Sequence, residues 1–288
     1  QPLIDVTQNF ATLQTSTISA GRVFEMMDRD DYEPKQAGSL KEIDRGDIRF
    51  EHVSFSYDGK RDVLKDISFD VKNGQTIAFV GHTGSGKSSI INLFMRFYEF
   101  DRGQILIDGQ NIKDYSQEAL RKSIGLVLQE PFLYHGTIAS NIRMYHEELT
   151  DEEIRQAAAF VDVTDFIEGL PGGYDHSVTE RGSTLSTGQR QLLAFARTIA
   201  AQPKILILDE ATANIDQETE EMIQNSLKKM RQGRTTIAIA HRLSTIQDAD
   251  CIYVLDKGKI IESGNHDQLI ALGGTYKKMY DLQAGMMK

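Results

Sequence analysis

The chain has 288 residues, of which 40% are hydrophobic and 26% charged, a composition typical of a globular protein. We expect one large α/β domain or two lobes at this length. The 32 basic and 42 acidic residues give a net charge of −10, which argues against nucleic-acid binding through the overall field. The single cysteine, Cys251, excludes an internal disulfide and fits a reducing compartment. No run approaches the roughly 20 apolar residues of a membrane-spanning helix, and polar residues interrupt any signal-peptide core.

The N-terminal residues have a pattern of their own. Apolar or small residues recur at alternating spacings of three and four over residues 1–30, which predicts one amphipathic helix, and Pro2 suits its first turn. Such a stripe is ordinarily a packing surface. The charged segment from Asp28 to Asp47 contains Pro34 and Gly38 and is typical of a linker.

From Asp47 onward the pattern changes to strands that alternate with helical stretches. Helices are expected over Ser88–Tyr98 and through most of 134–202. This alternation predicts a mostly parallel sheet covered on both faces, with an antiparallel part at its start. The expected strands are Ile48–Tyr57, Val63–Val71, Thr76–Val80, Gln104–Asp108, Gly125–Gln129, Ile205–Asp209, Thr235–Ala240, Ile252–Asp256 and Lys259–Glu262.

A glycine-rich loop lies between the buried run Thr76–Val80 and the helical stretch that follows it. Its sequence, from Gly81 to Ser88, matches the Walker A pattern in the strand–loop–helix context that this motif requires. Backbone N–H groups of such a loop surround phosphate oxygens, and the helix start adds its positive end. The residues expected to bind the nucleotide here are Gly81, Thr83, Gly84, Ser85, Gly86, Lys87, Ser88 and Ser89.

A second acidic site follows the apolar strand Ile205–Asp209. Asp209 and Glu210 end this strand, at the edge where an open α/β sheet places its ligand groups. Asp209 would hold Mg²⁺ through water, and Glu210 would act as general base on the attacking water. Alternatively, the two acids cap the helix that follows.

Further motifs resemble the nucleotide-binding domain of ABC exporters over about residues 45–285. The stretch 185–189, Leu-Ser-Thr-Gly-Gln, lies just before the expected helix Arg190–Ala201 and looks like the signature motif of that family, usually LSGGQ, and 179–182 is similar to the exporter X-loop. Gln129 matches the Q-loop, His241 the H-loop, and Tyr57 the adenine-stacking aromatic. The resemblance implies catalytic roles for Glu210, His241, Lys87 and Gln129, metal ligation by Ser88, Gln129 and Asp209, and nucleotide contacts from Tyr57, Ser186, Gly188, Gln189 and Asp216.

The resemblance also implies a fold: a P-loop NTPase with a RecA-like parallel sheet core, an antiparallel β subdomain and a helical subdomain that carries the signature. Four parts are expected. Residues 1–46 resemble the cytoplasmic extension of a last transmembrane helix plus a linker. Residues 47–133 hold the antiparallel part and the Walker A half of the core, 134–202 the helical subdomain, and 203–288 the Walker B and H-loop half with the C-terminal tail.

The family's cofactors and partners follow from the same resemblance. ATP and Mg²⁺ would be sandwiched head to tail between two such domains, on the cytoplasmic face of a cell membrane, with the transmembrane half outside this sequence. Thr187 replaces the first glycine of the usual signature pair, and 213–216 departs from the usual SALD. If position 187 needed a left-handed backbone, threonine would cost roughly 1–2 kcal/mol. An altered signature beside an intact Glu210 favours one subunit of a heterodimeric, multidrug-type exporter, with a homodimer as the alternative.

Three other functions remain open on the sequence. A regulatory nucleotide-binding module would not hydrolyse ATP, which Glu210 and His241 argue against. An ABC-type ATPase of chromosome maintenance or translation would need a coiled-coil insertion or tandem cassettes, and neither is in this sequence. An importer ATPase is disfavoured by the helix at residues 1–27 and by the exporter-like segment 179–182.

Overall fold

The computed structural model describes residues 2–29, 38–144, 146–209, 217–240 and 242–285. The chain divides into two units, Gln1–Gln36 and Ala37–Lys288. The first holds α1 (Pro2–Met27), so the predicted N-terminal helix is confirmed. Within this unit, the side chains of Phe10, Leu13 and Phe24 are 68%, 66% and 61% exposed. Among the described residues, no helix combines the length and hydropathy that crossing a bilayer requires.

The second unit is built on a six-stranded sheet in the order β12-β11-β3-β10-β9-β6. The strands from β11 to β6 in this order all pair parallel with their neighbours. Strand β12, at one edge, pairs antiparallel with β11. Strands β3 and β10 are buried along their whole length, as expected of parallel strands with both faces covered. The strands are β3 (Thr76–Val80), β6 (Ile124–Val127), β9 (Ile205–Asp209), β10 (Thr235–Ile239), β11 (Cys251–Asp256) and β12 (Lys259–Gly264).

A second, antiparallel sheet has the order β2-β1-β4-β5. Along β1 and β2, buried and exposed residues largely alternate, because one face of this sheet packs on the core. Its strands are β1 (Ile48–Phe55), β2 (Leu64–Val71), β4 (Arg102–Ile107) and β5 (Gln110–Asn111), and a short pair is formed by β7 (Gly136–Thr137) and β8 (Ser177–Val178).

Two hydrophobic cores lie on opposite faces of the parallel sheet, and the two-residue period of the strands divides their side chains between them. On β3, Ile77 and Phe79 belong to the core shared with the antiparallel sheet and α2. Ala78 and Val80 belong to the other core, which contains residues of α4, α5, α7, α8, α9 and α10. The predicted sheet covered on both faces is therefore confirmed.

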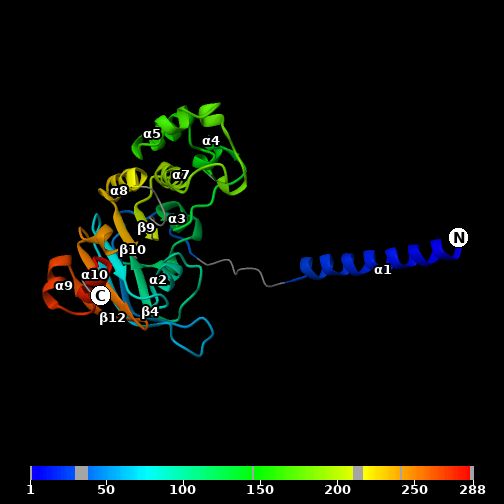
Figure 1. Cartoon of the computed structure of the whole chain (residues 1–288). Helices are drawn as coiled ribbons and strands as arrows, with labels where there is room; N and C mark the ends of the chain where they lie inside the picture. Colours follow the sequence, from blue (N-terminus) through cyan, green and yellow to red (C-terminus); the bar gives the residue numbers. More distant parts are fainter. Residues whose placement is uncertain (1, 30–37, 145, 210–216, 241, 286–288) are drawn as a thin grey trace. The chain divides into compact units, whose positions relative to one another are not determined.

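The helices cover these faces and form a helical part around α7 (Figure 1). Helix α7 packs against α4, α5 and α8. The α-helices are α2 (Lys87–Phe94), α3 (Gln117–Ser123), α4 (Ile138–Arg143), α5 (Asp151–Phe160), α6 (Thr164–Glu168), α7 (Thr187–Ala200), α8 (Gln217–Arg231), α9 (His266–Leu272) and α10 (Thr275–Gln283). Short 3₁₀ turns are η1 (Ile112–Asp114), η2 (Gly173–Asp175), η3 (Glu180–Gly182) and η4 (Leu243–Ile246).

Several strand and helix ends differ from the sequence prediction, among them those of α2 and β1. Helix α2 ends at Phe94 rather than Tyr98, because Arg96 adopts a left-handed conformation (φ 51°) and the Phe97 N–H donates back to the carbonyl of Asn92. A left-handed residue just past the last turn terminates a helix in this way. Strand β1 ends at Phe55, two residues before Tyr57, so this tyrosine lies in the connection that follows the strand.

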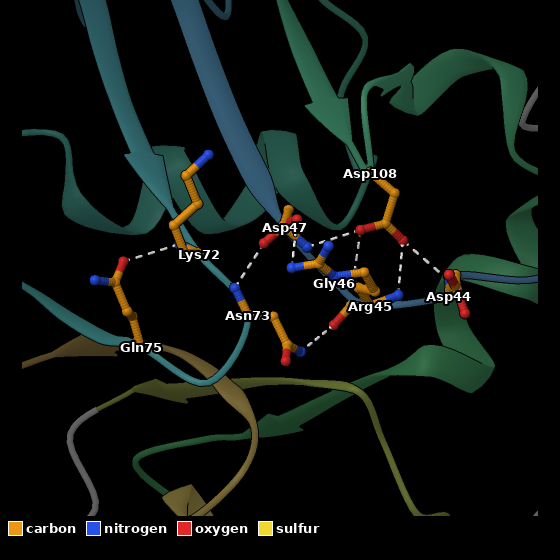
Figure 2. Close-up of polar contacts among 8 residues, drawn as sticks. All are labelled: Asp44, Arg45, Gly46, Asp47, Lys72, Asn73, Gln75 and Asp108. Carbon is orange, nitrogen blue, oxygen red and sulfur yellow. Dashed lines mark hydrogen bonds and ion pairs between the residues drawn. The ribbon is translucent and has the colours of Figure 1, made fainter.

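One carboxylate fixes the segment that enters the antiparallel sheet. Asp108 accepts hydrogen bonds from the backbone N–H groups of Asp44, Arg45, Gly46 and Asp47, at 3.0, 3.0, 2.9 and 2.8 Å (Figure 2). Asp47 in turn accepts from the backbone N–H of Asn73 at 2.7 Å. We call these contacts the Asp108 clamp. They tie residues 44–47 to the turns that follow β2 and β4.

Candidate functional site: a phosphate-binding loop at the edge of the sheet

The loop between β3 and α2 depends on glycine. Gly81, Gly84 and Gly86 have φ values of +152°, +79° and +111°, a region that side chains other than glycine rarely adopt. A Cβ on Gly81 would lie 2.3 Å from the carbonyl oxygen of Leu255, and one on Gly86 would lie 2.8 Å from a methyl carbon of Leu64. The sequence therefore uses glycine here both for backbone conformation and for close approach.

The polar groups of this loop fit a phosphate. Lys87 is 5% exposed, and its ammonium donates to the carbonyl oxygens of Gly81 at 2.7 Å and His82 at 3.1 Å, so the charge lies within the loop. Within the described part of the chain, the buried hydroxyl of Ser85 has no hydrogen-bond partner, so it is available to a ligand oxygen. Ser88 is exposed on the first turn of α2, whose leading N–H groups have no intrahelical acceptor.

The predicted adenine aromatic lies beside this loop. The Tyr57 hydroxyl donates to the Ser89 hydroxyl at 3.0 Å, and the Asn92 side-chain amide donates to the Tyr57 hydroxyl, also at 3.0 Å. Tyr57 is nevertheless 46% exposed. The structure thus brings together two groups of predicted nucleotide-binding residues that are about 30 positions apart in the chain.

The acidic site and the Q-loop residue share one edge of the sheet with the loop. In the parallel register, Ile239 pairs with both Phe79 and Asp209, and Val127 pairs with Leu208. The carboxyl ends of β3, β10, β9 and β6 are therefore level with one another. Asp209 is half-exposed at the end of β9, and Gln129 is exposed two residues beyond β6. The predicted residues Glu210, Asp216 and His241 lie outside the described residues.

The signature residues begin a helix rather than preceding one. The sequence predicts a helix that starts at Arg190, but α7 begins at Thr187, and Ser186 is its N-cap. The Ser186 hydroxyl accepts from the backbone N–H of Gln189 at 3.2 Å, and the Gln189 side chain accepts from the backbone N–H of Ser186 at 2.9 Å. This reciprocal capping box explains the earlier start, and Gly188 is buried in the first turn.

Thr187 carries no left-handed strain. It is not among the residues with positive φ and lies in the first turn of α7, so the cost considered for a left-handed threonine does not arise. Its hydroxyl accepts from the Arg190 guanidinium at 3.2 Å, while the same guanidinium donates to the carbonyl of Leu185 at 2.7 Å. Sequence reasoning missed Arg190, although its place three positions after Thr187 on a helix was a usable signal.

A hollow of about 580 Å³ joins segments that the sequence separates widely. Gln129 and Phe132 line one part of it, and Arg181, Thr187 and Arg190 line another. The backbone N–H of Arg181 donates to the carbonyl of Leu133 at 3.0 Å, which holds the two segments together. The exporter-like stretch 179–182 and the Q-loop residue therefore border the same concave surface.

The fold and the glycine-rich loop together place the chain in one class of proteins, the P-loop nucleotide-binding domains, here with an added antiparallel sheet and an added helical part. The family described as ABC transporter matches residues 64–213, and the chain belongs to that family. It is 71% identical over 286 residues to the "Putative ABC transporter ATP-binding protein exp8" of Streptococcus pneumoniae serotype 4, covering 99% of this chain and 49% of that protein. It is 51% identical to the "Probable multidrug resistance ABC transporter ATP-binding/permease protein YheH" of Bacillus subtilis, covering 99% of this chain and 42% of that protein.

A solved structure supports the same assignment. The structure of a bacterial Atm1-family ABC exporter with ATP bound matches with a TM-score of 0.83 and 40% identity, over 96% of this chain and 48% of that one. The chain spans about half the length of these relatives. The resemblance to exporter nucleotide-binding domains, and the predicted P-loop fold with its two subdomains, are confirmed.

Proposed function

We propose that this chain is the ATP-binding and ATP-hydrolysing domain of an exporter, which works on the cytoplasmic face of a cell membrane together with a transmembrane half. The observation that carries the proposal is the common edge of the parallel sheet, where the Walker A loop, Asp209 and Gln129 lie at the ends of strands in register. In the sequence, Glu210 follows Asp209 directly and His241 comes two residues after the end of β10.

Each residue has a role that its chemistry supports. Lys87 would exchange its bonds to loop carbonyls for bonds to phosphate oxygens, which are charge-assisted and therefore stronger. Glu210 would take the proton of the attacking water as general base, and His241 would donate a hydrogen bond to the terminal phosphate. Ser85 would donate its unpartnered hydroxyl to the same phosphates, and Asp216 would also contact the nucleotide.

The oxygen groups at the edge also fit Mg²⁺. Ser88, Gln129 and Asp209 offer a hydroxyl, an amide oxygen and a carboxylate, which are the ligand types that this ion prefers, and none of the three is fully buried. Bound there, Mg²⁺ would neutralise phosphate charge during the reaction. The side chains of Ser88 and Asp209 would hold the ion, and Gln129 would also touch the hollow described above.

The signature implies a second domain of the same kind. Ser186, Gly188 and Gln189 form the start of α7, whose free N–H groups and positive end suit the phosphate of a nucleotide held by a partner domain. The two domains, arranged head to tail, would then bind two ATP molecules between them, and hydrolysis would let the domains separate. The altered signature favours a heterodimer, while the unstrained helical backbone at Thr187 supports the homodimer alternative. The hollow between Gln129 and Arg181 is the surface where the transmembrane half would dock.

ATP hydrolysis over a range of protein concentrations tests the proposal, with the wild-type chain beside Glu210→Gln. A rate that rises more than linearly with concentration, and is lost in the variant while ATP binding persists, supports a composite site that works as a homodimer. Tight binding without turnover at any concentration supports a heterodimer that needs an intact partner signature. Absence of ATP binding by the wild-type chain would overturn the proposed function.

A further inference from the structure

The Tyr57 side chain is fixed by α2 through its hydroxyl. A phenol hydroxyl has one proton, and Tyr57 donates it to Ser89 at 3.0 Å. The hydroxyl oxygen can then only accept, and the amide of Asn92 donates to it at 3.0 Å. Ser89 and Asn92 are three positions apart on α2, so they lie on the same face of that helix.

The Tyr57 ring also contacts two other aromatic rings. The ring of Phe55 is nearly perpendicular to it, with centroids 4.7 Å apart, and the ring of Tyr98 likewise at 4.8 Å. Perpendicular pairs at this separation are attractive. Tyr57 still remains 46% exposed, so a large part of the ring is open to a ligand.

We propose that Asn92 is a positioning residue for the nucleotide base, acting through the Tyr57 hydroxyl. This inference rests on the proposed function. Helix α2 begins with Lys87 and Ser88, which would bind the phosphates, and little more than one turn later it presents Asn92 to the aromatic ring that would stack on adenine. One rigid helix therefore sets the distance between the base platform and the phosphate loop. Such preorganisation strengthens base binding without changing any phosphate contact.

Calorimetric titration of the chain with ADP and with inorganic pyrophosphate, both in the presence of Mg²⁺, separates the two halves of the site. Neither probe contains a γ-phosphate, so hydrolysis does not disturb the measurement. Asn92→Leu removes the donor but keeps a side chain branched at Cγ with the same number of heavy atoms, and Tyr57→Phe removes the hydroxyl but keeps the ring. Gln110→Leu, an equivalent change at an exposed residue of β5, is the control.

We expect Asn92→Leu to weaken ADP binding by about two- to tenfold, the effect of one net hydrogen bond, and to leave pyrophosphate binding unchanged. Tyr57→Phe should have the same effect, and the double variant should bind ADP no more weakly than the weaker single one. The inference is wrong if Asn92→Leu leaves ADP binding unchanged, weakens pyrophosphate equally, or multiplies with Tyr57→Phe. If the wild-type chain binds neither probe, the proposed function itself fails.

Discussion

Removing the Asp108 carboxylate should destabilise the domain in a way that the clamp makes calculable (Figure 2). The carboxylate accepts from four backbone N–H groups, and the two from Gly46 and Asp47, at 2.9 and 2.8 Å, are partly buried. Hydrogen bonds to a charged group contribute about 1.5–3 kcal/mol each when water cannot replace them. The bonds from Asp44 and Arg45 are exposed, so water will substitute for most of their contribution. We expect the lost bonds to lower the free energy of unfolding of Asp108→Ala by about 2–4 kcal/mol, and the left-handed φ of +51° at this position adds roughly 1 kcal/mol for alanine.

Two further variants make this expectation sharper. Asp108→Asn keeps an oxygen for one pair of N–H groups but turns an NH₂ group toward the other pair. It should therefore cost about half as much, and asparagine tolerates the left-handed φ of +51° at this position. Asp44→Ala removes an equal charge from the same segment but leaves its backbone N–H in place, which makes it the matched control.

Urea unfolding gives the free energies, and amide hydrogen exchange of residues 44–47 reports the clamp directly. Exchange at these amides should accelerate in Asp108→Ala and stay unchanged in Asp44→Ala. The reasoning is refuted if the two alanine variants have equal unfolding free energies, or if the four amides exchange at the wild-type rate without the carboxylate.

Three other predictions follow from single residues. Burial raises the pKa of Tyr276 to about 12, so between about pH 10 and 12 the phenol is deprotonated in the unfolded chain but still protonated in the folded one. The free energy of unfolding should therefore fall over this pH range, and Tyr276→Phe should flatten that fall in unfolding curves. Gly81→Ala should abolish ADP binding in calorimetry because its Cβ meets the carbonyl of Leu255. Gly84→Ala, with open space around its Cβ, should weaken ADP binding less, and an equal loss of ADP affinity in the two variants would contradict this. Thr187→Gly should lower the free energy of unfolding by only about 0.3 kcal/mol, the difference in helix propensity between threonine and glycine, while a gain in stability would mean that Thr187 is strained after all.

The sequence was sufficient for features that depend on local order. The Walker A loop, the strand ending at Asp209 and the helix at residues 2–27 are each encoded by consecutive residues with a clear period. Contacts between distant segments were not predictable in this way. The Asp108 clamp spans about 60 positions, and the Arg197 guanidinium bonds to carbonyl oxygens of Asn141 and Phe132, 56 and 65 positions away. Such pairs depend on which strands are neighbours, and local periodicity does not carry that information.

The signature shows a different limit of sequence reasoning. A glycine in the usual form of a motif suggests a left-handed backbone conformation. On that inference, threonine at position 187 would carry a cost in conformational free energy. The capping box of Ser186 and Gln189 instead starts a regular helix at this position, which needs no left-handed residue. Glycine is therefore not required here for backbone conformation, and threonine fits the same regular helix start.

Helix α7 links the two ends of the proposed mechanism. It begins at the signature and runs for 14 residues, about 21 Å at helical rise, to a region that packs against β6, the strand leading to Gln129. Near its end, Arg197 donates to the carbonyl oxygens of Asn141 and Phe132, at 2.7 and 2.9 Å. Phe132 lines the same hollow as Gln129. We therefore predict that a change in what occupies the hollow at Gln129 will either displace α7 or break the Arg197 bonds, and will thereby shift the signature.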